Sequence, residues 1–186
     1  NLADVMTHAL AHLWFGVLVT MKWWNGIWLN EAFATFMEVA CCNEYRPDWK
    51  RWAAFSLERS AAFEVDSLAS TRTVEYPVEA PADCEGMFDV LTYQKGGALL
   101  RMLEQYLTPE GFRQGVSHYL STHEYANTET GDLWDRIEEA VTGTPVRALM
   151  DSWIWQAGYP LVSARLEGGE LVLGQQRFAY GDSDDP

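Results

Sequence analysis

Residues 8–38 read HALAHLWFGVLVTMKWWNGIWLNEAFATFME, and this stretch carries the most specific pattern in the chain. His8 and His12 lie four residues apart in a helical pattern, so both imidazoles point to the same side of the expected helix. Eighteen residues separate His12 from Glu31, which lies near the start of the next expected helix, beside its predicted N-cap Asn30. This donor set can form a zinc site with a fourth position open for water, although paired histidines also occur without a metal.

Apolar residues recur with the period of an α-helix over most of the chain. The sequence predicts helices over residues 2–15, 31–44, a segment from Pro47, 89–106, 109–120, 132–143 and 145–155. Gly96 and Gly97 interrupt one of these helices and cost about 1 kcal/mol each relative to alanine, so we expect another backbone or a ligand to approach closely there. We also expect Lys95 and Arg101 to form ion pairs within this helix.

The periodicity changes from 3.6 to 2 after Gly158, and the residues on either side of the Gly-rich turn at 167–170 alternate. This pattern predicts a β-hairpin, whereas the prolines and polar residues of 67–87 predict an irregular excursion. We therefore expect a mainly α architecture in two parts. A helical lobe covers residues 1–157, and residues 158–186 form the start of a following β domain with an acidic tail.

The chain has 186 residues with 13 basic and 27 acidic side chains, giving a net charge of −14. This acidic balance argues against nucleic acid and against an anionic membrane as partners. Three cysteines are too few for a disulfide framework, and no signal peptide or bilayer-spanning apolar run is present. We therefore expect free thiols in a reducing, cytoplasmic compartment. Because the sequence starts at Asn1 rather than Met, we expect a fragment or a processed piece of a longer protein.

Residues 8–38 resemble the gluzincin zinc site of the aminopeptidase N family, whose pattern is H-E-x-x-H, eighteen residues and then E. Residues 88–98, FDVLTYQKGGA, are similar to the family's F-D-x-x-x-Y-x-K-G-A signature, and residues 150–160, MDSWIWQAGYP, resemble the end of its helical catalytic lobe. The resemblance implies the helical lobe of a thermolysin-like (gluzincin) catalytic domain. It also implies zinc-dependent hydrolysis of N-terminal residues from peptides.

The same resemblance implies roles for individual residues. His8, His12 and Glu31 match the ligands of one zinc ion, which in the family polarises the carbonyl of the first peptide bond for attack by water. Tyr93 matches the tyrosine that hydrogen-bonds the developing oxyanion. Glu38 lies seven residues after Glu31 on the same side of the expected helix. It either orients a ligand imidazole from behind or is a solvated helix charge.

The sequence departs from the family pattern at Ala9, where the family has the glutamate that acts as general base. An alanine cannot accept a proton, so we expect hydrolysis by this chain to be impaired. Leu13 and Val17 are also apolar where the family often has polar residues. Two explanations remain open: evolved or deliberate inactivation of the site, or repacking of the cleft so that this part can stand alone.

Several parts of the family's architecture are not among these residues, namely the G-x-M-E-N strand that holds the substrate's α-amino group, the amino-terminal β domain and the C-terminal helical domain. The expected partners are therefore a peptide substrate or the remaining domains of a parent enzyme. Two alternatives stay open beside the impaired aminopeptidase. The chain is a non-catalytic zinc- or peptide-binding module, or it is an engineered helical domain in which the histidines are relics.

Overall fold

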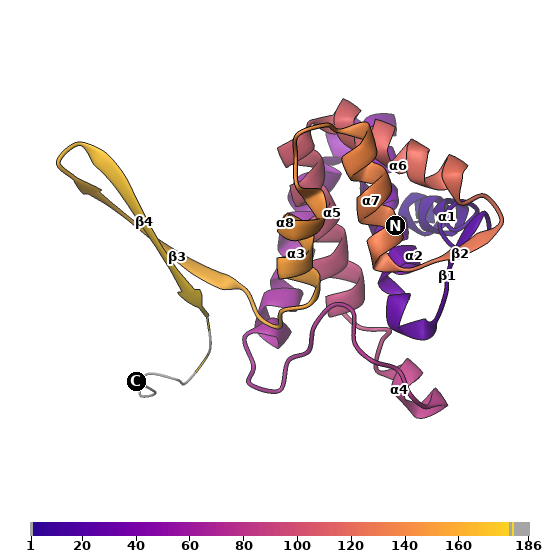
Figure 1. Cartoon of the computed structure of the whole chain (residues 1–186), viewed down its shortest axis with the longest axis horizontal. Coiled ribbons are helices and arrows are strands. Elements are labelled where there is room, and N and C mark those ends of the chain that lie inside the picture. The colour runs from indigo at the N-terminus through magenta and orange to yellow at the C-terminus, as the bar shows by residue number, and fades with distance from the viewer. Residues whose placement is uncertain (1, 179, 181–186) are drawn as a thin grey trace.

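Helices form most of the molecule and pack into one body, from which a β-hairpin extends, so the expected mainly α architecture is confirmed (Figure 1). The computed structural model describes residues 2–178 and 180. Its α-helices are α1 (Leu2–Ala11), α2 (Trp28–Tyr45), α3 (Arg51–Asp66), α4 (Pro81–Glu85), α5 (Gly96–Leu107), α6 (Pro109–Thr122), α7 (Thr130–Ala140) and α8 (Val146–Ile154). Among the residues described, no helix combines the length and apolar character needed to cross a membrane.

Helix α2 lies at the centre of the body, where α1, α3 and α5 pack against it. Its apolar side chains include Trp28 and Phe33, both almost completely buried. The ring of Phe33 stacks on Phe15 with centroids 4.3 Å apart. Burying one such side chain contributes roughly 1.5–3 kcal/mol, so α2 is held firmly on several sides. Helices α6, α7 and α8 pack in sequence against the same core, to which they contribute Phe112, Tyr119, Leu133, Trp134, Ile137, Val146, Met150 and Ile154.

The predicted start of α2 is wrong by three residues. The helix begins at Trp28, and Ile27 is its N-cap, so Asn30 does not cap it. The backbone amides of Asn30 and Glu31 both donate to the carbonyl of Ile27. The burial of Trp28 accounts for the difference, because a helical turn that includes this residue brings its indole into the core. The side-chain amide of Asn30 instead donates to the sulfur of Met21 at 2.9 Å.

Helix α1 also differs from its prediction, since it ends at Ala11 rather than at residue 15. The chain then turns through Gly16, whose φ of +141° is unfavourable for other residues. This turn leads into β1 (Val19–Met21), which pairs in parallel with β2 (Ala126–Thr128). This strand pair has no signal in the sequence, because each strand is only three residues long. Residues 67–87 are irregular as predicted, apart from α4.

The expected close approach at the glycine pair is confirmed, and the approaching partner is α2. A Cβ atom placed on Gly96 would lie only 2.6 Å from the Cβ atom of Ala32. The helical pattern before this contact is interrupted by a π-helical turn, Leu91–Lys95. The ion pair predicted for Lys95 within its own helix is wrong, because the ammonium is buried and pairs with Asp66 of α3. Arg101 does pair within α5, with Glu104.

The predicted hairpin is confirmed as β3 (Pro160–Glu167) and β4 (Glu170–Arg177), which pair in antiparallel register. Gly168 and Gly169 form its turn with φ values of 59° and 91°. The hairpin projects away from the helical body (Figure 1). The boundary placed between residues 157 and 158 stays a prediction, and the acidic tail at 181–186 lies outside the described residues.

Candidate metal centre

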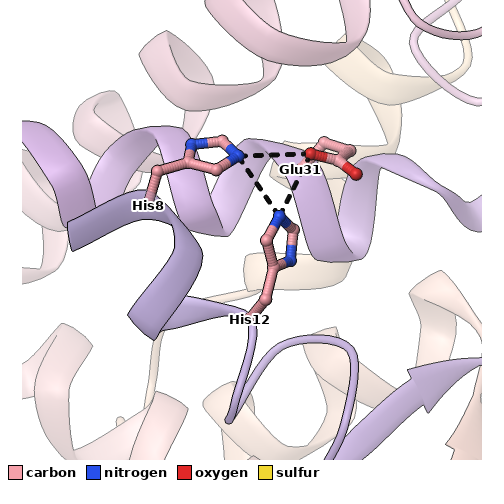
Figure 2. Close-up of side chains that lie close together, drawn as sticks. All are labelled: His8, His12 and Glu31. Atoms are coloured by element: carbon pink, nitrogen blue, oxygen red, sulfur yellow. Dashed lines mark hydrogen bonds and ion pairs between the residues drawn. The ribbon is translucent and has the colours of Figure 1, made fainter. Parts of the chain in front are cut away.

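His8 of α1, His12 in the turn directly after it and the first-turn glutamate of α2 converge (Figure 2). The Nε2 atoms of His8 and His12 are 3.2 Å apart, and each lies 3.4 Å from Oε2 of Glu31. All three side chains are partly buried. Within the described part of the chain, this is the one group of three potential ligands found close enough together to hold a metal ion.

The spacing of these three donor atoms fits a single zinc ion. Zinc binds histidine nitrogen at about 2.0–2.1 Å and carboxylate oxygen at about 2.0–2.2 Å, so tetrahedral ligands lie about 3.3 Å from one another. The observed separations of 3.2 and 3.4 Å match this value. Two nitrogens and one carboxylate also match the donor set of catalytic zinc sites, in which a fourth position remains free.

Hydrogen bonds behind the ligands fix the orientation of both imidazole rings. Nδ1 of His8 lies 2.9 Å from Oε2 of Glu38, and Nδ1 of His12 lies 3.1 Å from the carbonyl oxygen of Phe15. Because both partners can only accept, each Nδ1 carries a hydrogen, and in the neutral form of each ring the Nε2 lone pair is directed into the group. The contact expected of Glu38 is therefore present. The role of Phe15 had no sequence signal, because a backbone carbonyl can come from any residue type.

The electrostatics of the group favour a cation. Hydrogen bonds to Glu31 and Glu38 raise the pKa of His8 to about 9 against the opposing effect of burial. Burial alone would raise the pKa of Glu31, but His8, His12 and Tyr93 together bring that pKa below its usual value. Without a metal, the extra proton of the group is thus held on His8 beside ionised Glu31, and a divalent cation would take the place of this proton.

Tyr93 reaches the same group from the π-helical turn. Its ring lies nearly parallel to that of His8, with centroids 6.2 Å apart and an angle of 18° between the planes. Burial, followed by the charge of Glu31 and the hydrogen bond to it, raises the pKa of Tyr93. The phenol therefore remains protonated at neutral pH and can act as a hydrogen-bond donor.

Ala9 lies on α1 next to His8, and its side chain is exposed and offers no polar atom. Leu13 and Val17 are also exposed, at 53% and 65%. The explanation that these residues repack the cleft is therefore wrong for this chain, because the side chains of Leu13 and Val17 remain mostly in contact with solvent. The exposure of Ala9 itself leaves room at this position for a longer side chain.

Comparison with known proteins gives consistent matches. The family described as Peptidase family M1 domain matches residues 1–153. Aminopeptidase M1 of Arabidopsis thaliana is 42% identical over 183 residues, covering 98% of this chain and 21% of that protein. Leucyl aminopeptidase of Saccharolobus solfataricus is 44% identical over 180 residues, covering 96% and 23%. Tricorn protease-interacting factor F2 of Thermoplasma acidophilum is 44% identical over 179 residues, also covering 96% and 23%.

The chain spans only about a fifth of the length of these curated relatives. Within that span, the family match covers the ligand helices, the Tyr93 turn and most of α8. The mainly helical architecture is that of the family's helical lobe. This chain therefore belongs to peptidase family M1, the aminopeptidase N-like family that its motifs resemble.

Proposed function

We propose that this chain supplies the metal-binding part of an aminopeptidase active site, with His8, His12 and Glu31 as ligands of one zinc ion. The observation that carries the proposal is the triangle of donor atoms, with separations of 3.2, 3.4 and 3.4 Å. When bound, zinc supplies Lewis acidity, which polarises a carbonyl oxygen and lowers the pKa of water. The proposed substrate is a peptide with a free N-terminus.

The remaining residues of the site have separate tasks. Glu38 and the Phe15 carbonyl hold the two imidazole rings in position through their Nδ1 atoms. Tyr93, kept protonated, donates a hydrogen bond to the oxygen that gains negative charge as the peptide bond is attacked. Such a donor is worth about 10²–10³ in turnover when it is aimed at the oxyanion.

Ala9 makes this chain a weak hydrolase in its present form. No side-chain atom at this position can take the proton released by the attacking water, and general-base assistance is typically worth about 10²–10⁴-fold in rate. The second candidate function follows from the same observation. A complete ligand set beside a missing base also suits a module that binds zinc and a peptide without cleaving it.

Zinc content tests the shared part of both candidates. We expect one zinc per chain after dialysis, and substantially less for Glu31→Gln, which keeps the size of the side chain but removes its charge. Glu44→Gln, at an exposed position of the same helix, is the matched control and should retain the metal. A parent chain with well under one zinc would overturn the proposal and favour a helical domain with a relic site.

Restoration of the base separates the two candidates. We expect Ala9→Glu to increase zinc-dependent hydrolysis of an aminoacyl p-nitroanilide by about 10²–10⁴-fold over the parent. Ala9→Gln is the control, because it has the same size and polarity but accepts no proton at neutral pH. Equal rates for the two variants would contradict the aminopeptidase proposal and leave the binding module.

A further inference from the structure

Tyr93 lies on a single π-helical turn, Leu91–Lys95, and side-chain contacts at each end hold this turn in place. The amide of Lys95 donates to the carbonyl of Val90 at 3.0 Å, which gives the i to i−5 pattern of a π-helix. Such turns are rare, less stable than α-helix and frequent at functional sites. The position of the Tyr93 ring therefore depends on what holds the two ends of this turn.

The first end of the turn is held by Asp89. One oxygen of its carboxylate accepts hydrogen bonds from the amides of Leu91 and Thr92, at 2.9 and 3.2 Å. The same oxygen accepts from the guanidinium of Arg72 at 2.6 Å. This arrangement resembles a helix N-cap, and it fixes where the turn starts.

The second end is held by a buried ion pair. Nζ of Lys95 donates to Oδ2 of Asp66 at 2.6 Å and to the carbonyl of Gly158 at 3.0 Å. Lys95 is 7% exposed and Asp66 is 1% exposed. Burial lowers the pKa of Lys95, and Asp66 opposes this effect.

The other carboxylate oxygen of Asp66 also binds Gly158, so Asp66 and Lys95 together form a clamp on the backbone of this residue. Oδ1 accepts from the amide of Gly158 at 2.9 Å and from the hydroxyl of Thr71 at 2.8 Å. The ion pair thus engages both polar backbone groups of Gly158, two residues before β3 begins. Gly158 has a φ of +83°, a conformation that glycine adopts readily.

We propose that the Asp66–Lys95 pair is a positioning device that holds the Tyr93 turn against Glu31 and links its position to the segment entering the β3–β4 hairpin. Both contacts come from one ion pair: Lys95 ends the turn that carries Tyr93, and Gly158 starts the segment that leads out of the helical body. Replacing a buried ion pair by apolar residues often costs no stability, so stability alone does not explain why the pair is there. The catalytic relevance of the device rests on the proposed function of Tyr93.

The test measures the position of Tyr93 directly in metal-free protein. The chain is labelled with 3-fluorotyrosine, and the ¹⁹F resonance of Tyr93 is identified by its loss in Tyr93→Phe. Lys95→Met removes one partner of the pair. Asp66→Leu/Lys95→Met removes both charges, so it leaves no unpaired buried charge if the single variant fails to fold. Arg101→Met, which breaks the Arg101–Glu104 pair farther along α5, is the matched control.

We expect the paired variant to shift the Tyr93 resonance by more than one linewidth while the control leaves it in place. Hydrogen exchange of the Gly158 amide should become about tenfold faster or more in the paired variant, because the amide loses its acceptor. A folded paired variant with an unmoved Tyr93 resonance would overturn the positioning role. An unchanged Gly158 exchange rate would overturn the link to the hairpin.

The result of the fluorine and hydrogen-exchange measurements does not depend on the test of the proposed function. The fluorine and exchange measurements require neither zinc nor turnover, so a failed zinc measurement leaves them interpretable. Conversely, the side chains of His8, His12 and Glu31 do not take part in the clamp, so loss of the positioning effect leaves the metal-centre proposal standing.

Discussion

At the scale of single residues, the candidate metal centre depends on groups that stand behind the ligands. The Glu38 carboxylate accepts the Nδ1 hydrogen of His8, and the Phe15 carbonyl accepts that of His12. Gly16 belongs to the same arrangement, because a Cβ atom there would lie 3.2 Å from the carbonyl oxygen of His12 and 3.5 Å from its Nδ1. The ligand orientations are therefore set partly by residues that would never touch the metal.

Glu38→Ala should weaken zinc binding by about 10–100-fold, because His8 loses the partner that orients its ring and raises its basicity. The zinc Kd can be measured by competition with a chromophoric chelator. Glu44→Ala removes an exposed carboxylate from the same helix and should leave the Kd unchanged. If both variants bind zinc as the parent does, Glu38 is only a solvated helix charge.

At the scale of elements, the close contact between α5 and α2 sets how the Tyr93 turn approaches Glu31. Gly96 follows the turn directly, and Ala32 follows Glu31 directly, so their contact lies beside the site. The ideal Cβ position of Gly96 is only 2.6 Å from the Cβ of Ala32, a distance that real atoms do not adopt. Any side chain at position 96 must push the two elements apart.

Gly96→Ala should therefore destabilise the fold by about 1–3 kcal/mol, in the range of overpacked cores. Urea unfolding followed by tryptophan fluorescence measures this loss. Gly86→Ala is the control, because the nearest atom to its ideal Cβ lies 3.7 Å away and its φ is −69°. A loss as small as that of the control would contradict the packing argument.

The sequence predicted best what depends on neighbours along the chain. The four-residue spacing of His8 and His12 is a local property of α1 and the turn that follows it, and the hairpin follows from alternation around Gly168 and Gly169. Apart from the ends of α1 and α2, the errors concern partners that are distant in sequence. Lys95 pairs with a residue 29 positions away, and β1 pairs with a strand more than 100 positions away. Short segments carry too little pattern to reveal such contacts.

At the scale of the whole molecule, a buried carboxylate joins three separate segments. Glu75, in the irregular segment before α4, is only 4% exposed. It accepts hydrogen bonds from Asn25 at 2.5 Å, from Trp28 at 3.2 Å and from the hydroxyl of Thr130. Burial raises the pKa of Glu75, and the nearby acid Glu129 adds to this effect.

Because its folded-state pKa is raised, Glu75 contributes stability below its usual pKa of 4.5, and this contribution is lost as pH rises through the higher folded value. Glu75→Gln should therefore gain stability relative to the parent between pH 4.5 and 7, since the neutral amide keeps two acceptor contacts and Asn25 can reverse its own amide. The measurement is Tm against pH for both proteins. Glu79→Gln changes an exposed residue of the same segment and should show no such trend. A Tm curve for Glu75→Gln that runs parallel to that of the parent would refute the prediction.

The β3–β4 hairpin has a consequence for concentrated solutions of this chain. Its register pairs Ala164 with Leu173 and Leu166 with Leu171, so one face is apolar, and Leu166 is 78% exposed. Among the described residues, neither strand has a further neighbour. Two molecules can therefore meet face to face or edge to edge at this hairpin. Mutual repulsion from a net charge of −14 opposes such encounters. Colloidal stability should consequently fall as added salt screens that repulsion.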